Sequence, residues 1–215
     1  MLTLYLVSMV IKVKEILYAS SFLILFVFLQ NCTCKKGLGI DCSNNIYRFK
    51  INILITPTTD TVNIGDTIWM RMNNTVNLLD INTGNTINFS GAANLGSVLN
   101  IRTLSGQNEF TTEAINKFNY HVKEGALIRM TNDIAEYNFS EKNNQFLFNL
   151  GVIAKEKGTF RILFSNAANV YRNSDKCTKA TFIINVGNVN RNPYLNPFYT
   201  GGPYPEGGDY YFVVR

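Results

Sequence analysis

The sequence contains few of the residue types from which enzymes and metal sites are built. Its 215 residues include one histidine and four cysteines, and no CxxC pair or GxSxG motif occurs. A zinc site made of Cys and His is therefore not expected, and a Ser-His-Asp or Cys-His arrangement would have to be built around His121. This residue alternates with Tyr120 and Val122 in an expected strand, so we interpret it as a solvated side chain. We predict no catalytic residue, no metal ligand and no cofactor.

Charged residues are also sparse. Asp, Glu, Lys and Arg make up 16% of the chain, and the net charge is +5. The positive excess is scattered along the sequence, whereas a nucleic-acid-binding protein shows a basic patch or stripe, so we predict no nucleic-acid partner. The carboxylates indicate neither a glycosidase pair nor a calcium loop, because Asp60 and Asp66 lie in turn-like sequence and no dense acidic run occurs.

Long hydrophobic runs are absent apart from one near the N-terminus. Residues 16–29 read ILYASSFLILFVFL without a charge, and Lys12 and Lys14 precede them. The run is shorter than the roughly 20 residues of a membrane-spanning helix, and a basic stretch before a short apolar core is typical of a secretory signal peptide. We predict a signal peptide over residues 1–31, with Met9 as an alternative start.

The end of this segment, Leu29-Gln30-Asn31-Cys32, resembles a bacterial lipobox, in which a leucine three residues before a cysteine directs lipidation of the thiol. Cys32 is therefore the predicted lipid attachment site, and residues 32–44 are the predicted tether. Several acyl chains would hold the protein stably at a membrane. The alternatives are an uncleaved N-terminal anchor helix, or cleavage that leaves Cys32 free or in a disulfide.

The other cysteines are Cys34, Cys42 and Cys177. Export places them in an oxidising compartment, where disulfides form. Cys42 precedes the first expected strand and Cys177 precedes a late one, so a bridge between them would join the start of the domain to its last third. Pairing of Cys34 with Cys42 is the local alternative, because sequence alone does not fix connectivity.

The remaining residues, 45–215, have the size of a single domain and consist largely of alternating apolar and polar positions. Period-two alternation predicts strands, and it occurs at 47–55, 118–122, 146–152, 160–164, 180–186 and 210–215. Thr83-Gly84-Asn85 is typical of a hairpin turn, whereas residues 112–118 give only a short candidate helix. Many short strands with few helices indicate an all-β antiparallel sandwich or barrel.

Two segments favour an Ig-like β-sandwich. VNIGDTIWM (62–70) resembles the turn into the second strand of Ig-like domains, and KEKGTFRILF (155–164) resembles the corner that opens a late strand. They are farther apart than in a standard domain of about 100 residues. We therefore expect an insertion near residues 91–130.

Aromatic residues, prolines and paired glycines gather in residues 188–211. Tyr194, Phe198, Tyr199 and Tyr204 are candidate binding residues, because rigid rings on a loop can contact a carbohydrate or a partner protein. The alternative, which we favour, is that these rings cover an open end of the sandwich core.

The chain as a whole resembles the uncharacterised small lipoproteins of Bacteroidetes. The resemblance rests on the lipobox, on DTVNIGDTIWM (60–70), KEKGTFRILF (155–164) and KCTKATFIINV (176–186), and on the closing strand GDYYFVVR. It implies a lipid-anchored β-sandwich and brings no catalytic residues. Surface export in such bacteria is linked to acidic residues after the lipid cysteine. Thr33-Cys34-Lys35-Lys36 stand there instead, which favours a periplasm-facing anchor in the outer membrane.

These patterns predict a lipid-anchored envelope protein whose β-sandwich acts by binding or scaffolding, without catalysis. Its expected partners are the membrane, through the N-terminal lipid, and envelope proteins or glycans. The alternative is a secreted hydrolase or its carbohydrate-binding accessory module. A third interpretation, a eukaryotic secreted glycoprotein, rests on NxS/T triplets that arise by chance in an Asn-rich chain.

Overall fold

The computed structural model describes residues 46–104, 110–188, 190–201 and 207–215. The predicted signal peptide (1–31), the lipid site Cys32, the tether (32–44), Cys42 and Tyr204 lie outside these residues. The described part belongs to one compact unit, Ser43–Arg215. None of its helical segments is long and apolar enough to cross a bilayer.

The alternating segments form strands, as predicted. In β1 (Ile46–Thr56) the side chains of Phe49, Ile51 and Ile53 are fully buried, and the residues between them are exposed. The same alternation continues in the long strands β12 (Gln145–Ala154) and β15 (Asp175–Val186). The bounds of the other strands are β2 Thr61–Val62, β3 Thr67–Thr75, β4 Asn77–Leu79, β5 Thr86–Asn88, β6 Gly96–Thr103, β7 Thr112–Glu113, β8 Phe118–Glu124, β9 Ala126–Met130, β10 Ala135–Asn138, β11 Ser140–Lys142, β13 Gly158–Phe164, β14 Ala167–Arg172 and β16 Asp209–Val214.

The predicted helix at 112–118 is wrong. Its residues form β7, which pairs with β6, and then a single 3₁₀ turn, η1 (Ile115–Lys117). The Ala114 N–H donates to the Ile101 carbonyl, and Ile115 is buried. Pairing with β6 therefore outweighs the weak local preference for helix.

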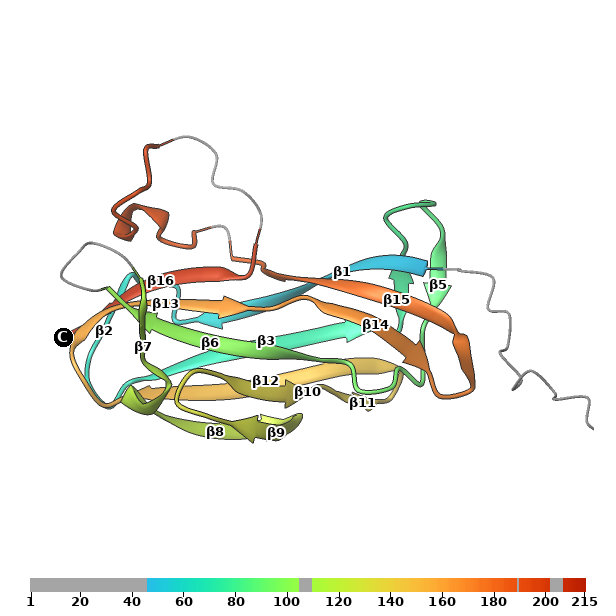
Figure 1. The fold of residues 1–215 in the computed structure, drawn as a ribbon, viewed down its shortest axis with the longest axis horizontal. Helices are drawn as coiled ribbons and strands as arrows, with labels where there is room; N and C mark the ends of the chain where they lie inside the picture. Colours follow the sequence, from blue (N-terminus) through green and yellow to red (C-terminus); the bar gives the residue numbers. More distant parts are fainter. Residues whose placement is uncertain (1–45, 105–109, 189, 202–206) are drawn as a thin grey trace, which may run out of the picture. The chain divides into compact units, whose positions relative to one another are not determined.

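The strands form a β-sandwich of two seven-stranded sheets with a separate β4–β5 hairpin (Figure 1). In the first sheet the order is β11-β12-β3-β1-β15-β14. β8 also pairs with β12, along the part of β12 that follows its pairing with β11. In the second sheet the order is β2-β16-β13-β6-β10-β9, and β7 pairs with β6. The core lies between them, where Phe118 meets Phe160 and Phe148 meets Tyr137, with ring centroids 4.9 and 5.6 Å apart.

Two features differ from the antiparallel Ig-like sandwich that the sequence predicts. The sheets are not wholly antiparallel, because β1 runs parallel to β15 and β16 runs parallel to β2. Residues 91–130, expected as an insertion, supply β6, which lies inside the second sheet between β13 and β10. Leu99 and Ile101 of β6 are fully buried, so this strand completes the core.

One side of the sandwich is closed by chain segments that pass from sheet to sheet. The chain leaves β8 of the first sheet through Gly125 and enters β9 of the second, and it returns from β10 to β11 through Phe139. Gly125 has φ +95°, and a Cβ there would lie 2.7 Å from the Asn138 carbonyl oxygen. Only glycine fits this crossing, because it needs both a positive φ and the close backbone approach.

The predicted turn at Thr83-Gly84-Asn85 is confirmed, since β4 and β5 pair around it. The buried carboxylate of Asp80 fixes this hairpin to β1 by accepting from the Arg48 N–H at 2.8 Å and from the Thr83 hydroxyl at 2.7 Å. Burial acts to raise the pKa of Asp80, but hydrogen bonds from Arg48, Thr83 and Asn82 outweigh it and hold the pKa below its ordinary value.

Candidate functional site: the outer face of the first sheet

The outward side chains of β1, β3, β12 and β8 form cross-strand rows on the first sheet. One row runs Thr56, Trp69, Gly151 and His121, in that strand order. The next row runs Leu54, Arg71, Asn149 and Glu124. Directly opposed residues on one face of a sheet lie close enough to interact. Within these rows Trp69 lies directly opposite Gly151, although 82 positions separate them in the sequence.

Trp69, the one tryptophan in the chain, lies across Gly151. A Cβ on Gly151 would lie 3.0 Å from the ring atom Cζ3 of Trp69 and 3.0 Å from the Thr67 methyl carbon. Glycine inside a strand often marks such a close approach. Gly151 therefore makes room for the half-buried indole ring to lie against the β12 backbone.

Two cations gather at this ring. The Lys123 ammonium lies 4.1 Å from the Trp69 ring centroid, and the Arg71 guanidinium carbon lies 5.5 Å from it. Both distances are within the range of a cation–π interaction. The pairing of β8 with β12 shifts register between Asn149 and Leu150, which leaves Lys123 as the extra residue of a β-bulge. Bulges redirect side chains, and this one brings Lys123 over the ring.

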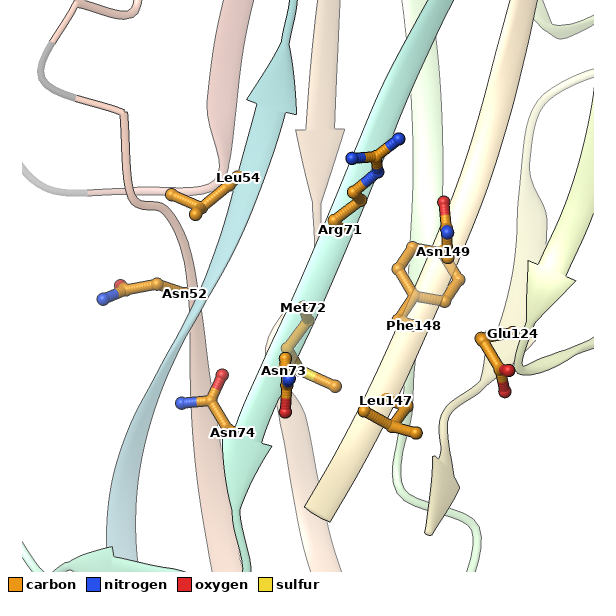
Figure 2. Close-up of a pocket in the computed structure, with 10 residues that line it drawn as sticks. All are labelled: Asn52, Leu54, Arg71, Met72, Asn73, Asn74, Glu124, Leu147, Phe148 and Asn149. Atoms are coloured by element: carbon orange, nitrogen blue, oxygen red, sulfur yellow. The ribbon is translucent and has the colours of Figure 1, made fainter. Parts of the chain in front are cut away.

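A groove of about 490 Å³ adjoins the Trp69 row (Figure 2). β1 pairs with β3 only over Leu54–Thr56, and the two strands separate beyond it. Met72 and Phe148, which belong to the core, therefore line the groove together with outward polar side chains. The full lining is Asn52, Leu54, Arg71, Met72, Asn73, Asn74, Glu124, Leu147, Phe148 and Asn149.

The groove is rich in amide groups. Its lining includes Asn52, Asn73, Asn74 and Asn149. The side-chain oxygen of Asn149 is buried and accepts no hydrogen bond from the residues that the structure describes. Buried polar atoms normally have a partner, so a donor that reached the groove floor would be stabilised there.

The charge on this face is strongly one-sided. The outward positions of β1, β3, β12 and β8, all within the described residues, carry the cations Arg48, Lys50, Arg71 and Lys123. Glu124 is the one carboxylate among them, and Lys142 of β11 pairs with it at 2.8 Å. The Lys142 ammonium holds the pKa of Glu124 below its ordinary value. We call this surface, from β1 to β8, the basic face.

The predicted aromatic residues lie elsewhere, on the segment between β15 and β16. Tyr194 and Phe198 are 55% and 65% exposed, so these two rings do not cover the sandwich core, which differs from the favoured interpretation of the sequence. Tyr199 is half-buried. Tyr194 follows a left-handed Asn192 (φ 54°) and belongs to a single 3₁₀ turn, η2 (Pro193–Leu195).

The hydroxyl of Tyr194 donates to the Asp60 carboxylate. This bond is the main cause of opposite pKa changes, since it lowers the pKa of Asp60 and raises the pKa of Tyr194 to about 12. The segment is also tied to β16, because the Asn192 amide donates to the Tyr211 carbonyl at 2.9 Å. The segment thus offers two exposed rings, those of Tyr194 and Phe198.

Cys177 forms a disulfide. The other cysteines, Cys32, Cys34 and Cys42, lie outside the described residues. Because β1 and β15 are parallel, Ile46 lies opposite Lys179, so the start of the described domain runs beside the segment that follows Cys177. This pairing fits the predicted bridge to Cys42, which stays a prediction.

His121 lies on the basic face, where its ring meets Trp69 edge-on at 6.1 Å between centroids. Within the described ranges, no group of three or more His, Cys, Asp or Glu side chains could hold a metal ion. The Trp69 ring can stack on a ligand, and the side chains around it can donate hydrogen bonds and attract anions.

Sequence reasoning missed the basic face. Trp69 and Arg71 stand at alternate positions of TIWMRM, which marks them as sharing one side of a strand. Gly151 inside an apolar strand also signalled a close approach. The missing information was the pairing of β3 with β12 and of β12 with β8, which is non-local.

No protein-family model, no curated protein and no solved structure matches this chain, so its function is inferred from its own residues.

Proposed function

We propose that this chain is a lipid-anchored protein of the bacterial envelope whose Ig-like β-sandwich binds a ligand on the basic face without catalysis. The observation that carries the proposal is the position of Trp69, an outward ring laid on Gly151 beside a groove lined by amides. Binding sites combine aromatic surface with a few placed polar groups. The basic face has both, and rigid strands position them.

The anchor part of the proposal rests on the lipobox-like sequence at Leu29–Cys32 and on the basic residues Lys35 and Lys36 after it. We propose that residues 32–44 tether the single domain, residues 45–215, to the periplasmic side of the outer membrane. Intact mass spectrometry of the mature N-terminus tests this. A chain that begins at Cys32 with added acyl mass, lost in Cys32→Ser, supports the anchor, and an unmodified chain contradicts it.

The carbohydrate-binding alternative is favoured by the same surface. Aromatic rings stack on sugars, and asparagine amides both donate to and accept from hydroxyl groups. A scaffolding role, by contrast, would need a partner protein that covers the face. We therefore place glycans ahead of proteins as the ligand class, whether the domain acts alone or beside a hydrolase.

Trp69 fluorescence tests the location of binding. Because the chain has one tryptophan, a change in its emission on addition of a ligand reports the basic face alone. We expect soluble envelope polysaccharides to change the emission, and we expect Tyr194→Ala/Phe198→Ala to leave that change intact. A ligand that binds by calorimetry without changing the emission, and that the loop variant no longer binds, would move the site to the 190–201 segment.

A further inference from the structure

We infer that the ligand of the basic face is an anionic polysaccharide, such as a polymer of uronic acids, whose acid groups bind at Arg71 and Lys123 beside Trp69. This inference rests on the proposed function and adds the chemical class of the ligand.

Two cations of the basic face meet at one ring. The Lys123 ammonium and the Arg71 guanidinium lie 4.1 and 5.5 Å from the same ring centroid. Two like charges that meet at one ring repel each other. An anion bound beside them removes that repulsion and accepts charge-assisted hydrogen bonds.

The described part of the chain provides no such anion beside Trp69. Among the described residues, neither Arg71 nor Lys123 forms an ion pair. Glu124 lies in the same cross-strand row as Arg71, but its carboxylate pairs with Lys142 at 2.8 Å. An external acid group is therefore the partner that this pair of cations lacks.

The order of the outward side chains indicates what kind of molecule carries the acid group. Successive outward residues of a strand are roughly 6.6 Å apart, so the Trp69 row and the groove beyond it present a ring, two cations and then amides along one line. Hydroxyl groups match the amides of Asn73 and Asn149, and the acid groups match the cations. A polymer with both groups on each ring fits this order.

Other polyanions fit less well. Proteins that bind single-stranded nucleic acids stack successive bases on several aromatic side chains, whereas the outward residues of β1, β3, β12 and β8 include a single tryptophan and no tyrosine or phenylalanine. An anionic membrane surface would call for exposed apolar side chains that insert into it. Leu54, 52% exposed, is the one large apolar residue on these strands that is both outward and mostly exposed, apart from Ile46 at the sheet end.

The test is calorimetric titration of the full chain in detergent with two matched pairs of polymers. Polygalacturonate is compared with its fully methyl-esterified form, and dextran sulfate with dextran, so that each pair differs in charge. We expect the anionic member of at least one pair to bind at least tenfold more tightly than its neutral partner. Its affinity should fall as salt rises from about 50 to about 300 mM, because exposed charges are screened.

Variants assign the effect to the two cations. Arg71→Gln/Lys123→Gln should lower the affinity for the anionic polymer at least tenfold, because a lost charge-assisted hydrogen bond costs about that much. The matched control, Lys157→Gln/Lys176→Gln, removes two exposed positive charges outside the basic face and should change the affinity less than twofold. Circular dichroism melts confirm that each variant is folded.

Each result has a distinct meaning. Equal binding of charged and neutral polymers on the basic face overturns the ligand class and leaves the proposed function standing. Binding of no polysaccharide, with no change in Trp69 emission, overturns the proposed function as well. Tighter binding of a single-stranded oligonucleotide or of anionic vesicles, with the same dependence on Arg71 and Lys123, overturns the polysaccharide assignment.

Discussion

The outer faces of the two sheets differ in what their cationic side chains contact. On the second sheet the cations meet carboxylates: Arg102 pairs with Glu113 at 3.0 Å, Arg161 with Asp209 at 2.5 Å and Arg129 with Glu136 at 3.4 Å. On the first sheet, Arg71 and Lys123 meet a tryptophan ring instead. Register produces the difference, because Arg102 lies directly opposite Glu113 whereas Arg71 lies opposite Asn149 and Leu54.

This contrast distinguishes charged residues that stabilise the fold through ion pairs from charged residues that can bind a ligand. Ion pairs on the second sheet neutralise their own surface and leave little field to attract a ligand. The basic face keeps its positive potential, which steers an anionic partner toward it. Substitutions on one sheet at a time test this contrast.

The largest effect is expected from charge reversal on the basic face. Arg71→Glu/Lys123→Glu should weaken binding of an anionic polysaccharide at least a hundredfold, because attraction becomes repulsion. The exchange Arg102→Glu/Glu113→Arg on the second sheet keeps an ion pair and should leave the affinity unchanged. Calorimetry on both variants measures this. Equal losses in the two variants would show that net charge, rather than the basic face, drives binding.

The next largest expected effect is the loss of stability when Asp80 is replaced. This buried carboxylate, which fixes the β4–β5 hairpin to β1, is satisfied by N–H and O–H donors, so Asp80→Ala leaves the N–H groups of Arg48 and Thr83 without an acceptor. We expect a loss of about 2–3 kcal/mol in the free energy of unfolding, measured by urea denaturation at pH 7.

The pH dependence of that stability follows from the lowered pKa of Asp80. A carboxylate with a depressed folded-state pKa stabilises the fold above its unfolded value of about 3.9, and the contribution is lost as pH falls through the lower folded value. The difference in stability between the natural chain and Asp80→Asn should therefore shrink as pH falls below about 4. A difference that stays constant down to pH 2 would contradict this.

Alanine variants of Arg161 and Arg71 compare how much a cation on each face contributes to stability. The Arg161 and Asp209 side chains are 29% and 18% exposed, so Arg161→Ala leaves a largely buried carboxylate unpaired and should cost about 1–2 kcal/mol. Arg71→Ala removes a cation that has no ion pair in the described residues and should cost less than about 0.5 kcal/mol. Thermal melts of both variants give the comparison, and a costlier Arg71→Ala would reverse it.

Gly151→Ala tests the packing of the Trp69 ring against β12. The added methyl group would lie 3.0 Å from both the ring and Thr67, so the ring must shift, at a cost of about 1 kcal/mol. Fluorescence emission of Trp69 should change, and polysaccharide affinity should fall. The control Gly84→Ala alters a turn where a Cβ meets open space and should leave the emission unchanged.

How far the sequence predicts this structure depends on the range of the interactions involved. β1, β12, β13, β15 and β16 were predictable because alternation within each strand reveals its buried side. The parallel pairing of β1 with β15 was not, since it joins residues more than 130 positions apart. The short helix at 112–118 was predicted wrongly because β7 pairs with β6, the strand before it in the chain, and this pairing outweighs a weak local preference for helix.

The candidate site also has features that the sequence predicts and features that depend on non-local pairing. Composition alone pointed to the aromatic segment near Tyr194, and two of its rings are exposed. The basic face could not be read from composition, because Trp69, Lys123 and Gly151 come from three strands. The β-bulge that brings Lys123 over the ring is a feature of pairing, which no local pattern encodes.

The central claim, that the basic face is the binding face, is tested most directly by NMR shift mapping with a short oligogalacturonate. The single indole N–H signal, that of Trp69, should move first, together with amide signals of β3, β8 and β12. The signals of β6, β13 and the 190–201 segment should stay in place. Shifts confined to those latter regions, with the indole signal unmoved, would contradict the claim.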